Sequence, residues 1–476
     1  MKMMGSVLND EEIKEIHRQS IYILENVGVK VPSEKALGML EASGAKIDWD
    51  KQIVFIPENL VQKCLASAPK EFTLGARNPE YDFPMPSSYS VMNLDGTGVN
   101  VLDHRTGKRR PAALQDVSDA ARVFEEIEIG KVLWSPVIPY DVPSGASGVL
   151  NTATSLMNCS KHVQDEAKNI REVPYLIEIV KAITGSVEEL ISRKIYSVTY
   201  CTVAPLCHDP EMLEATMELT KYQVPVLIYP MPACGSTGPA SLASNIALAN
   251  AEALSAMVIF QLASPGTPVI YGAALGIIDR RSGVFLEGAV ETVLQLTAMN
   301  QVGKYYGFPT IIAGCLSDAL ETGMQAVMEK VLTTLPLVLN RVDVVQGIGL
   351  IESSMTLSLE QMLIDAEIGQ LCNRMQAGIH MAPEKNLYED IKTVGQGGHY
   401  LKQKSTRALF RSGEYFTPVL SERSTYDAWM EMGSPSMFSK AHEKVENILA
   451  AEMRNPLDSQ TQKVIEEIME EAKAKL

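Results

Sequence analysis

Two short runs decide the fold of this 476-residue chain: IYSVTYCTV at residues 195–203 and VPVLIY at residues 224–229. Both runs are rich in β-branched and aromatic residues, which favours strands. The stretch between them, residues 210–222, has the spacing of apolar residues that is typical of a helix. Parallel strands need a crossover of this kind, so the pair predicts a βαβ unit.

The same alternation repeats along the chain. It predicts strands near residues 89–94, 132–138, 162–166, 195–203, 224–229, 268–276, 310–315 and 342–348. It predicts helices at about 114–129, 147–158, 172–184, 210–222, 240–263, 287–306, 322–339 and 359–378. Eight such units close a sheet, so we expect an α/β protein with a (β/α)8 barrel of the TIM type. The alternative, a doubly wound sheet, needs a glycine-rich dinucleotide turn after the first strand, and the sequence has none there.

The chain extends beyond these units at both ends. Asn9 and Asp10 begin a predicted helix, a shorter helix follows near residues 34–43, and a small β segment spans residues 53–56. The last hundred residues read as mostly helical and end in a charged helix from Gln460. We therefore divide the chain into an N-terminal helical cap (1–88), the barrel (89–379) and a helical C-terminal tail that packs on the barrel (380–476).

Composition narrows the function classes. The net charge of -16 disfavours nucleic acid and anionic membranes as partners. The apolar stretch at residues 240–263 carries Asn250 and Glu252, which favours a buried helix over a membrane span. The N-terminus turns acidic without an apolar secretory segment, and the seven cysteines form no CxxC pair. These features predict a cytoplasmic protein with reduced thiols.

Aromatic residues gather at the predicted ends of the strands, where barrel enzymes place their chemistry. Ring faces attract a desolvated cation, and a quaternary ammonium has no strong hydrogen bond to offer instead. Packing in the core explains any one of these rings equally well. We select four of the rings as a predicted cage for an ammonium group: Trp134, Tyr140, Tyr229 and Tyr271.

Two further groups of side chains fall near strand ends. Arg280 and Arg281 follow the sixth strand, where they could pair with a substrate carboxylate or belong to an exposed turn. Cysteines near strand ends suit a zinc-bound thiolate, although their spacing matches no compact metal motif. These cysteines are Cys201, Cys207, Cys234 and Cys315. We therefore predict no metal site and keep a zinc-thiolate methyltransferase as an alternative.

Three segments carry a resemblance to a known family. They are EEIKEIHRQSIYILENVGVKV at residues 11–31, the stretch from Ser317 through Leu320 to Glu329, and QGGHYL at residues 396–401. In this order and spacing they resemble the trimethylamine methyltransferase family over nearly the whole chain. The second segment resembles the family's pyrrolysine site, with Leu320 or an immediate neighbour in that place. A family His-Thr-Arg reads Lys404-Ser405-Thr406-Arg407 here, so one histidine is lost.

The resemblance implies methyl transfer to the cobalt(I) of a corrinoid carried by a separate protein, since the chain has no DxHxxG corrinoid motif. It implies self-association, and a quaternary amine as methyl donor, because members without pyrrolysine are similar to glycine betaine methyltransferases. We expect glycine betaine first, then proline betaine, then carnitine. His399 joins the two arginines as an expected partner of the substrate carboxylate, and Leu320 is expected to line the space that pyrrolysine fills elsewhere.

A quaternary amine does not need a pyrrolysine to activate it. A quaternary nitrogen is already positive and leaves as a neutral amine, so position and desolvation suffice. Trimethylamine must instead carry a proton that does not quench cobalt(I). The same cage would serve a non-catalytic betaine-binding protein, which remains a second alternative. An unrelated barrel lyase or aldolase would usually need a lysine at an inner strand end, and the predicted strands offer none in a convincing position.

Overall fold

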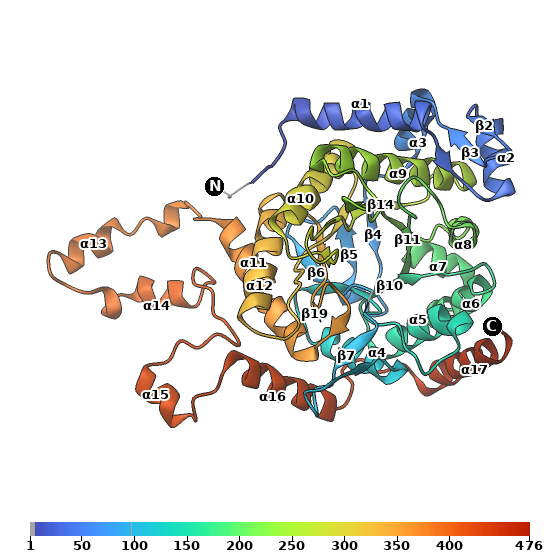
Figure 1. The fold of residues 1–476 in the computed structure, drawn as a ribbon. Helices are drawn as coiled ribbons and strands as arrows, with labels where there is room; N and C mark the ends of the chain where they lie inside the picture. Colours follow the sequence, from blue (N-terminus) through green and yellow to red (C-terminus); the bar gives the residue numbers. More distant parts are fainter. Residues whose placement is uncertain (1–4, 97) are drawn as a thin grey trace.

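The computed structural model describes residues 5–96 and 98–476. These residues form a closed barrel of eight parallel strands in the order β10-β11-β12-β14-β17-β18-β6-β9, which confirms the predicted fold (Figure 1). Seven of these strands lie inside the predicted runs, and β9 begins two residues before its predicted run. The strands are β6 (Val91–Asn93), β9 (Gly130–Trp134), β10 (His162–Glu166), β11 (Tyr196–Cys201), β12 (Val226–Tyr229), β14 (Val269–Ala273), β17 (Thr310–Ala313) and β18 (Val344–Gln346).

Helices surround the barrel, and every predicted crossover helix is present. They are α4 (Leu114–Glu125), α5 (Ser147–Asn158), α6 (Val173–Thr184), α7 (Val187–Arg193), α8 (Pro210–Thr220), α9 (Leu242–Ala263), α10 (Val290–Tyr305), α11 (Met324–Leu339) and α12 (Leu359–Ala377). Within the described ranges, α9 alone is long and apolar enough to cross a membrane. Most of its residues are buried against the barrel and α1, as expected for a core helix.

The N-terminal segment packs on α9. The predicted first helix is α1 (Asp10–Asn26), which Asn9 and Glu12 begin with a capping box. The Oγ of Ser20 donates to the carbonyl of Ala247 at 2.9 Å and joins α1 to α9. The predictions for this segment did not include α3 or the strands β1, β2, β4 and β5. Its elements are β1 (Val29–Lys30), α2 (Glu34–Ala42), β2 (Lys46–Asp48), β3 (Ile53–Phe55), α3 (Glu58–Ser67), β4 (Phe72–Leu74) and β5 (Phe83–Met85).

The C-terminal segment has two parts with different surroundings. Helix α16 (Met437–Ala450) packs on α12 and α4, and α17 (Ser459–Lys475) packs on α5 and α6. Between α12 and α16, residues 379–435 project from the barrel as an arm (Figure 1). The arm carries α13 (Tyr388–Val394), α14 (Lys404–Phe410) and α15 (Tyr426–Glu431). The division of the chain at residues 88/89 and 379/380 stays a prediction.

Two small sheets grow from the loops that follow barrel strands. The strands of the first are β13 (Ala233–Cys234), β15 (Gly276–Ile278) and β16 (Phe285–Leu286). The strands of the second are β7 (Asn100–Leu102), β8 (Arg109–Pro111), β19 (Leu350–Ile351) and β20 (Thr356–Leu357). Because the loops after parallel strands lie at one end of the barrel, both sheets flank the C-terminal mouth.

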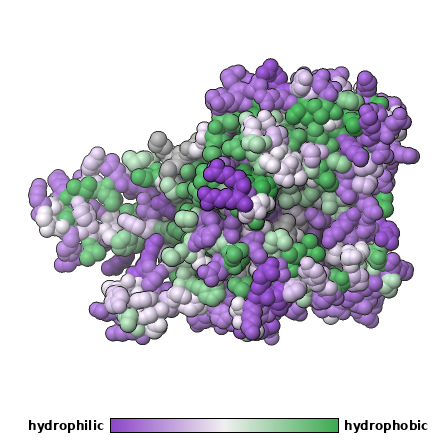
Figure 2. Space-filling model, viewed as in Figure 1, coloured by the Kyte–Doolittle hydropathy of each residue, from purple (hydrophilic) through white to green (hydrophobic). Residues whose placement is uncertain are grey.

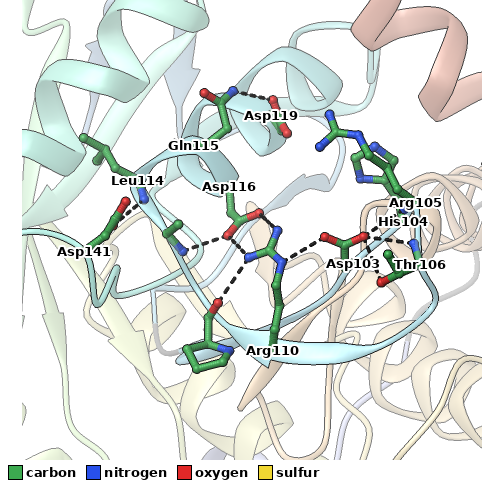
Figure 3. A network of polar contacts seen from close by, with 12 residues as sticks. Asp103, His104, Arg105, Thr106, Arg110, Leu114, Gln115, Asp116, Asp119 and Asp141 are labelled. Atoms are coloured by element: carbon green, nitrogen blue, oxygen red, sulfur yellow. Dashed lines mark hydrogen bonds and ion pairs between the residues drawn. The ribbon is translucent and has the colours of Figure 1, made fainter.

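Arg110 fixes the β7–β8 hairpin to the start of α4 (Figure 3). Its guanidinium donates to both carboxylate oxygens of Asp116 at 2.7 Å and to Asp103 at 2.9 Å. The hydrogen bond from Arg110 lowers the pKa of Asp103 to about 2. This bidentate contact holds one rim of the mouth in a defined position.

Candidate functional site

Five buried side chains meet at the mouth of the barrel, and we refer to them as the mouth cluster. They are Asp95, Trp134, Tyr229, Glu287 and Gln346. Trp134, Tyr229 and Gln346 are the last residues of β9, β12 and β18, while Asp95 follows β6 by two residues. Glu287 follows β16 and reaches the cluster from the flanking sheet. The electrostatic coupling of Glu287 and Tyr229 to Asp95 places these groups near one another.

The indole of Trp134 and the phenol of Tyr229 form an edge-to-face pair, with ring centroids 6.0 Å apart and an interplanar angle of 76°. The backbone N–H of Trp134 donates to the side chain of Asn93 at 3.1 Å, which fixes the end of β9. A Cβ on Gly96 would lie 2.2 Å from the indole nitrogen. Only glycine at this position lets the indole occupy its place.

The polar atoms of the cluster are incompletely bonded. Oδ1 of Asp95 is buried and has no hydrogen-bond partner among the described residues. The hydroxyl of Tyr229 and Nε2 of Gln346 are also buried and make no hydrogen bond of ordinary geometry there, although the Gln346 side chain lies close enough to the Tyr229 hydroxyl to lower its pKa. The oxygen of the Gln346 amide is used, because it accepts from Asn93 at 3.2 Å. Buried polar atoms in folded proteins almost always have partners, so the free oxygen of Asp95 beside the loosely bonded Tyr229 and Gln346 indicates a ligand site.

The cluster is electrostatically suited to a cation. Burial raises the pKa of the Asp95 carboxyl to about 7, and the neighbouring Glu166 raises it as well. Burial raises the pKa of Glu287 to about 8, although Ser354 donates to its carboxyl. The buried Lys330 is committed to Asp365 at 2.8 Å. A cation placed among these carboxyls would favour their ionised forms and gain their attraction.

A second carboxyl group lies at the end of β10. Ser135 donates to Asp165 at 2.5 Å, and burial raises the pKa of Asp165 to about 7. The thiol of Cys201 lies 3.7 Å from Glu166. Burial raises the pKa of this thiol well above its usual value, and the carboxylates Glu166 and Asp95 raise it further. In the ligand-free chain this environment favours the neutral thiol.

Cys207 follows Cys201 across a tight turn in which Val203 pairs with Cys207. The thiol of Cys207 contacts the carbonyl of His208, and the imidazole of His208 bonds to Tyr200 and Ser255. Within residues 5–96 and 98–476, no three His, Cys, Asp or Glu side chains are arranged to hold a metal ion. The geometry therefore gives no support to the zinc-thiolate alternative.

The loop after β17 connects the mouth to its neighbours. The carboxylate of Asp318 accepts from the backbone N–H groups of Glu287 (2.7 Å) and Gly288 (3.0 Å), and from the hydroxyl of Ser353 (2.9 Å). Glu329 of α11 accepts in turn from the N–H of Asp318 at 2.9 Å. This junction holds Glu287 in place, and it directly precedes Leu320, whose side chain is 80% exposed.

The structure brings together two of the four predicted cage rings, Trp134 and Tyr229. Tyr140 does not join them, because its loop runs along the β7–β8 hairpin and leaves the ring 67% exposed. Tyr271 is buried on the opposite face of β14, where its hydroxyl donates to Asn250 of α9 at 2.8 Å. Successive residues of a strand face opposite sides, so Tyr271 points to the helical layer. The expectation of one four-ring cage within a single chain is therefore corrected.

The predicted carboxylate partners are also separated. Arg280 and Arg281 lie exposed in the turn between β15 and β16, and the carboxylate of Asp279 accepts from the N–H of Arg281. His399 lies exposed in the arm, between α13 and α14. A role of these three side chains in substrate binding stays a prediction.

Sequence reasoning missed Asp95, Glu287 and Gln346. Asp95 stood directly after a predicted strand and Gln346 inside one, so their positions at the mouth could have been noted. Glu287 carried no such signal, since only the β16 turn and the Asp318 junction bring it to the cluster.

Fold and site define a barrel enzyme with an acidic, aromatic mouth, and comparison with known proteins places it. The family described as Trimethylamine methyltransferase (MTTB) matches residues 2–476, so the chain belongs to this family of methyltransferases.

Particular relatives cover almost the whole chain. It is 32% identical to the trimethylamine methyltransferase MttB of Methanosarcina thermophila, over 95% of each protein. It is 30% identical to the glycine betaine methyltransferase of Desulfitobacterium hafniense (strain Y51), over 95% of this chain and 94% of the relative. Among solved structures, it is similar to the monomethylamine methyltransferase of Methanosarcina barkeri, with 12% identity, 92% of each chain covered and a TM-score of 0.48.

Proposed function

We propose that this protein transfers a methyl group from a small quaternary amine to the cobalt(I) of a corrinoid carried by a separate protein. The observation that carries the proposal is the mouth cluster. Buried carboxyls, an edge-to-face pair of aromatic rings and an unpartnered oxygen of Asp95 suit a small cation with an apolar surface. The family relationship supplies the reaction class, and one relative bears the name of a glycine betaine methyltransferase.

The residues of this chain bind and orient the methyl donor. Trp134 and Tyr229 offer ring surfaces to the methyl groups, and Asp95 and Glu287 offer negative charge to the nitrogen. The low exposure of the cluster excludes water from the reacting methyl group. As the carbon–nitrogen bond breaks, its electron pair goes to nitrogen and the amine leaves neutral. No side chain needs to donate a proton to the leaving group.

A corrinoid would supply the cobalt(I) nucleophile from outside this chain. The mouth cluster lies at the end of the barrel where such a protein would approach, between the two flanking sheets. The sequence has no DxHxxG motif that would hold the group in this chain. The corrinoid protein is therefore proposed as a partner, and we place the reaction in the cytoplasm.

Leu320 or an immediate neighbour stands at the proposed pyrrolysine position, and we propose that this distinguishes the chain from a trimethylamine enzyme. Leu320 follows the Asp318 junction at the mouth and has an aliphatic side chain with no electrophile. Since a quaternary donor needs no covalent activation, Leu320 is compatible with that substrate class. We keep the order glycine betaine, proline betaine, carnitine, with Arg280, Arg281 and His399 as proposed carboxylate partners.

The first experiment measures methylation of free cob(I)alamin by the purified protein. The visible spectrum is followed with glycine betaine, proline betaine, carnitine, the tetramethylammonium ion and trimethylamine in turn. We expect methylcobalamin from one or more quaternary amines and none from trimethylamine. Transfer from trimethylamine as fast as from any quaternary amine would contradict the role given to Leu320.

Calorimetry on the same panel separates the alternatives. Binding of a betaine without transfer to cob(I)alamin or to a corrinoid protein would favour a non-catalytic binding protein. If the protein shows no binding and no transfer with any member of the panel, the proposed substrate class is wrong. Stoichiometric zinc in the purified protein would revive the zinc-thiolate alternative.

A further inference from the structure

The arm, residues 379–435, is built unlike the rest of the chain. Residues 379–419, all of which the structure describes, include no buried side chain, and Leu420 is the first buried residue of the arm. Its three helices have seven, seven and six residues. Isolated helices shorter than about 12 residues are marginal in water, because most helical stability comes from packing of an apolar face. The arm therefore lacks a core of its own.

The arm is nevertheless rich in large apolar side chains, which Figure 2 shows among polar ones on the projecting part of the molecule. Those more than 40% exposed are Ile379, Met381, Tyr388, Ile391, Tyr400, Leu401, Phe410, Tyr415, Val419, Tyr426, Met430 and Met432. Five are aromatic, and at about 200 Å² each they offer on the order of 600 Å² of exposed surface over the whole arm, of which roughly 200 Å² belongs to Tyr400 and Phe410. A stable interface buries about 800 Å² on each partner.

The arm is attached to the barrel through its residues 414–420, which bond to α12. The guanidinium of Arg374 donates to the carbonyl of Glu414 at 2.8 Å. The carboxylate of Glu367 accepts from the N–H groups of Val419 (2.8 Å) and Leu420 (2.6 Å). These contacts fix the base of the arm and direct its outer part, residues 385–413, away from the barrel.

A second unpartnered apolar face lies beside the base of the arm, on α11. Met324, Met328, Val331 and Leu332 are 92%, 66%, 37% and 38% exposed. Their spacing of four, seven and eight residues places them on one side of the helix, and we refer to them as the α11 stripe. Apolar side chains on this face contribute nothing to the core of their own chain. Leu320, also exposed, lies at the mouth end of the stripe.

Charge selects the partner of the arm. Residues 391–413 contain five Lys or Arg and no Asp or Glu, which gives a charge of +5 in a chain whose net charge is -16. The exposed Glu321 flanks the α11 stripe, and the exposed Glu291 begins the neighbouring helix α10. A basic, apolar segment and an acidic, apolar face on one side of the same molecule are complementary between two copies.

We propose that two copies of this chain exchange arms, so that residues 391–413 of each copy pack on the α11 stripe of the other. The contact is isologous, since each copy supplies one arm and one stripe around a twofold axis. It covers Leu320 and brings the basic segment, including His399, to the rim of the partner's barrel mouth. The exchange gives the arm the core that it lacks in a single chain. It does not depend on the proposed reaction.

The test measures the mass of the full-length protein in solution by light scattering after size exclusion. Leu401→Glu changes the arm, and Met328→Glu changes the stripe. The control is Tyr22→Glu on the outer face of α1, since Tyr22 is 65% exposed and thus comparable to Met328. We expect two chains, or an even multiple, in the wild type and in the control. Each test variant should have half that mass or less while keeping its circular dichroism.

Mixing the two test variants gives the sharper readout. A heterodimer restores one complete contact, because the intact arm of Met328→Glu meets the intact stripe of Leu401→Glu. Native mass spectrometry should therefore show heterodimers where neither variant forms homodimers.

Four results would overturn the proposal. The first is a wild type that is monomeric at about 50 µM, a concentration at which an association of ordinary affinity would be populated. The second is wild-type mass in both test variants, and the third is monomers of both variants that form no heterodimers on mixing. The fourth is loss of corrinoid-protein binding by Leu401→Glu at unchanged mass. The last would assign the arm to the corrinoid protein instead.

Discussion

The barrel mouth and the arm are incomplete in opposite ways. At the mouth, an oxygen of Asp95 is buried without a partner among the described residues, and the buried polar atoms of Tyr229 and Gln346 are only loosely bonded to each other. In the arm, apolar side chains such as Leu401 and Phe410 are exposed without a core. A buried polar atom gains from a small polar or charged ligand, whereas an exposed apolar surface gains from another protein. The mouth is therefore expected to bind a small ligand, and the arm is expected to bind another protein chain.

The largest expected effect comes from the charge at the mouth. Asp95→Asn keeps the shape of the side chain and removes its charge. A charge pair at about 4 Å is worth about 4 kcal/mol at an effective dielectric constant of about 20. If removing the charge of Asp95 costs half of this energy, the Kd rises roughly 30-fold. Calorimetry with the quaternary amine that supports methyl transfer measures it. The control is Asp50→Asn in an exposed turn, and a Kd within twofold of wild type would remove Asp95 from the site.

The aromatic pair gives the next effect. Tyr229→Ala should raise the Kd of the same ligand about tenfold, because one ring face is lost, while Tyr229→Phe should change it less than about threefold. Tyr140→Ala is the matched control, since the structure places that ring in solvent. Equal losses at both positions would restore the cage expected from the sequence, with Tyr140 moving to the mouth on binding. Circular dichroism checks that Tyr229→Ala still folds.

The third expected effect is a dependence of ligand affinity on pH, caused by proton binding at the mouth. Burial raises the pKa of Asp95 to about 7, so this carboxyl is mostly neutral at pH 6 and mostly ionised at pH 8.5. We expect the Kd of the cation to fall by up to about tenfold over that range. Asp95→Asn should flatten the profile, and an affinity that weakens with rising pH would contradict the assignment.

The stability of the ligand-free protein should fall as the pH rises, whereas its affinity for the cation increases. Because the folded pKa of Asp95 lies above its ordinary value of 3.8, the folded chain holds a proton that the unfolded chain has released between about pH 4 and 7. Glu287, with a pKa of about 8, extends this window upward. The thermal midpoint should therefore fall by a few degrees from pH 5 to 8.5, and saturating ligand should restore more of it at the higher pH.

The smallest effect concerns the charges of the arm. Raising NaCl from 0.05 to 0.5 M should weaken the association of two chains about threefold, since salt screens exposed charges. Sedimentation velocity measures the change, and the double variant Lys402→Gln, Lys404→Gln should show a flatter dependence. Stronger association at high salt would mean that apolar contact alone holds the arm.

Most of the barrel could be predicted because its signals are local. The runs at residues 195–203 and 224–229 carry the apolar, β-branched character of buried parallel strands, and the crossovers carry helical spacing. The site could be predicted only in part. Trp134 and Tyr229, selected for their positions at strand ends, do lie together, but the same reasoning selected Tyr271, which the strand turns outward to Asn250.

The sequence by itself determined the fold class, the crossover helices, the acidic balance and the family, because these depend on composition, period and motif order along the chain. Only the tertiary structure decided which strand-end side chains meet. Glu287 reaches Asp95 through a junction of three loops at Asp318, and Tyr140 leaves the mouth along a hairpin that Arg110 holds. Such contacts join residues far apart in the chain, and no local pattern encodes the distance between them.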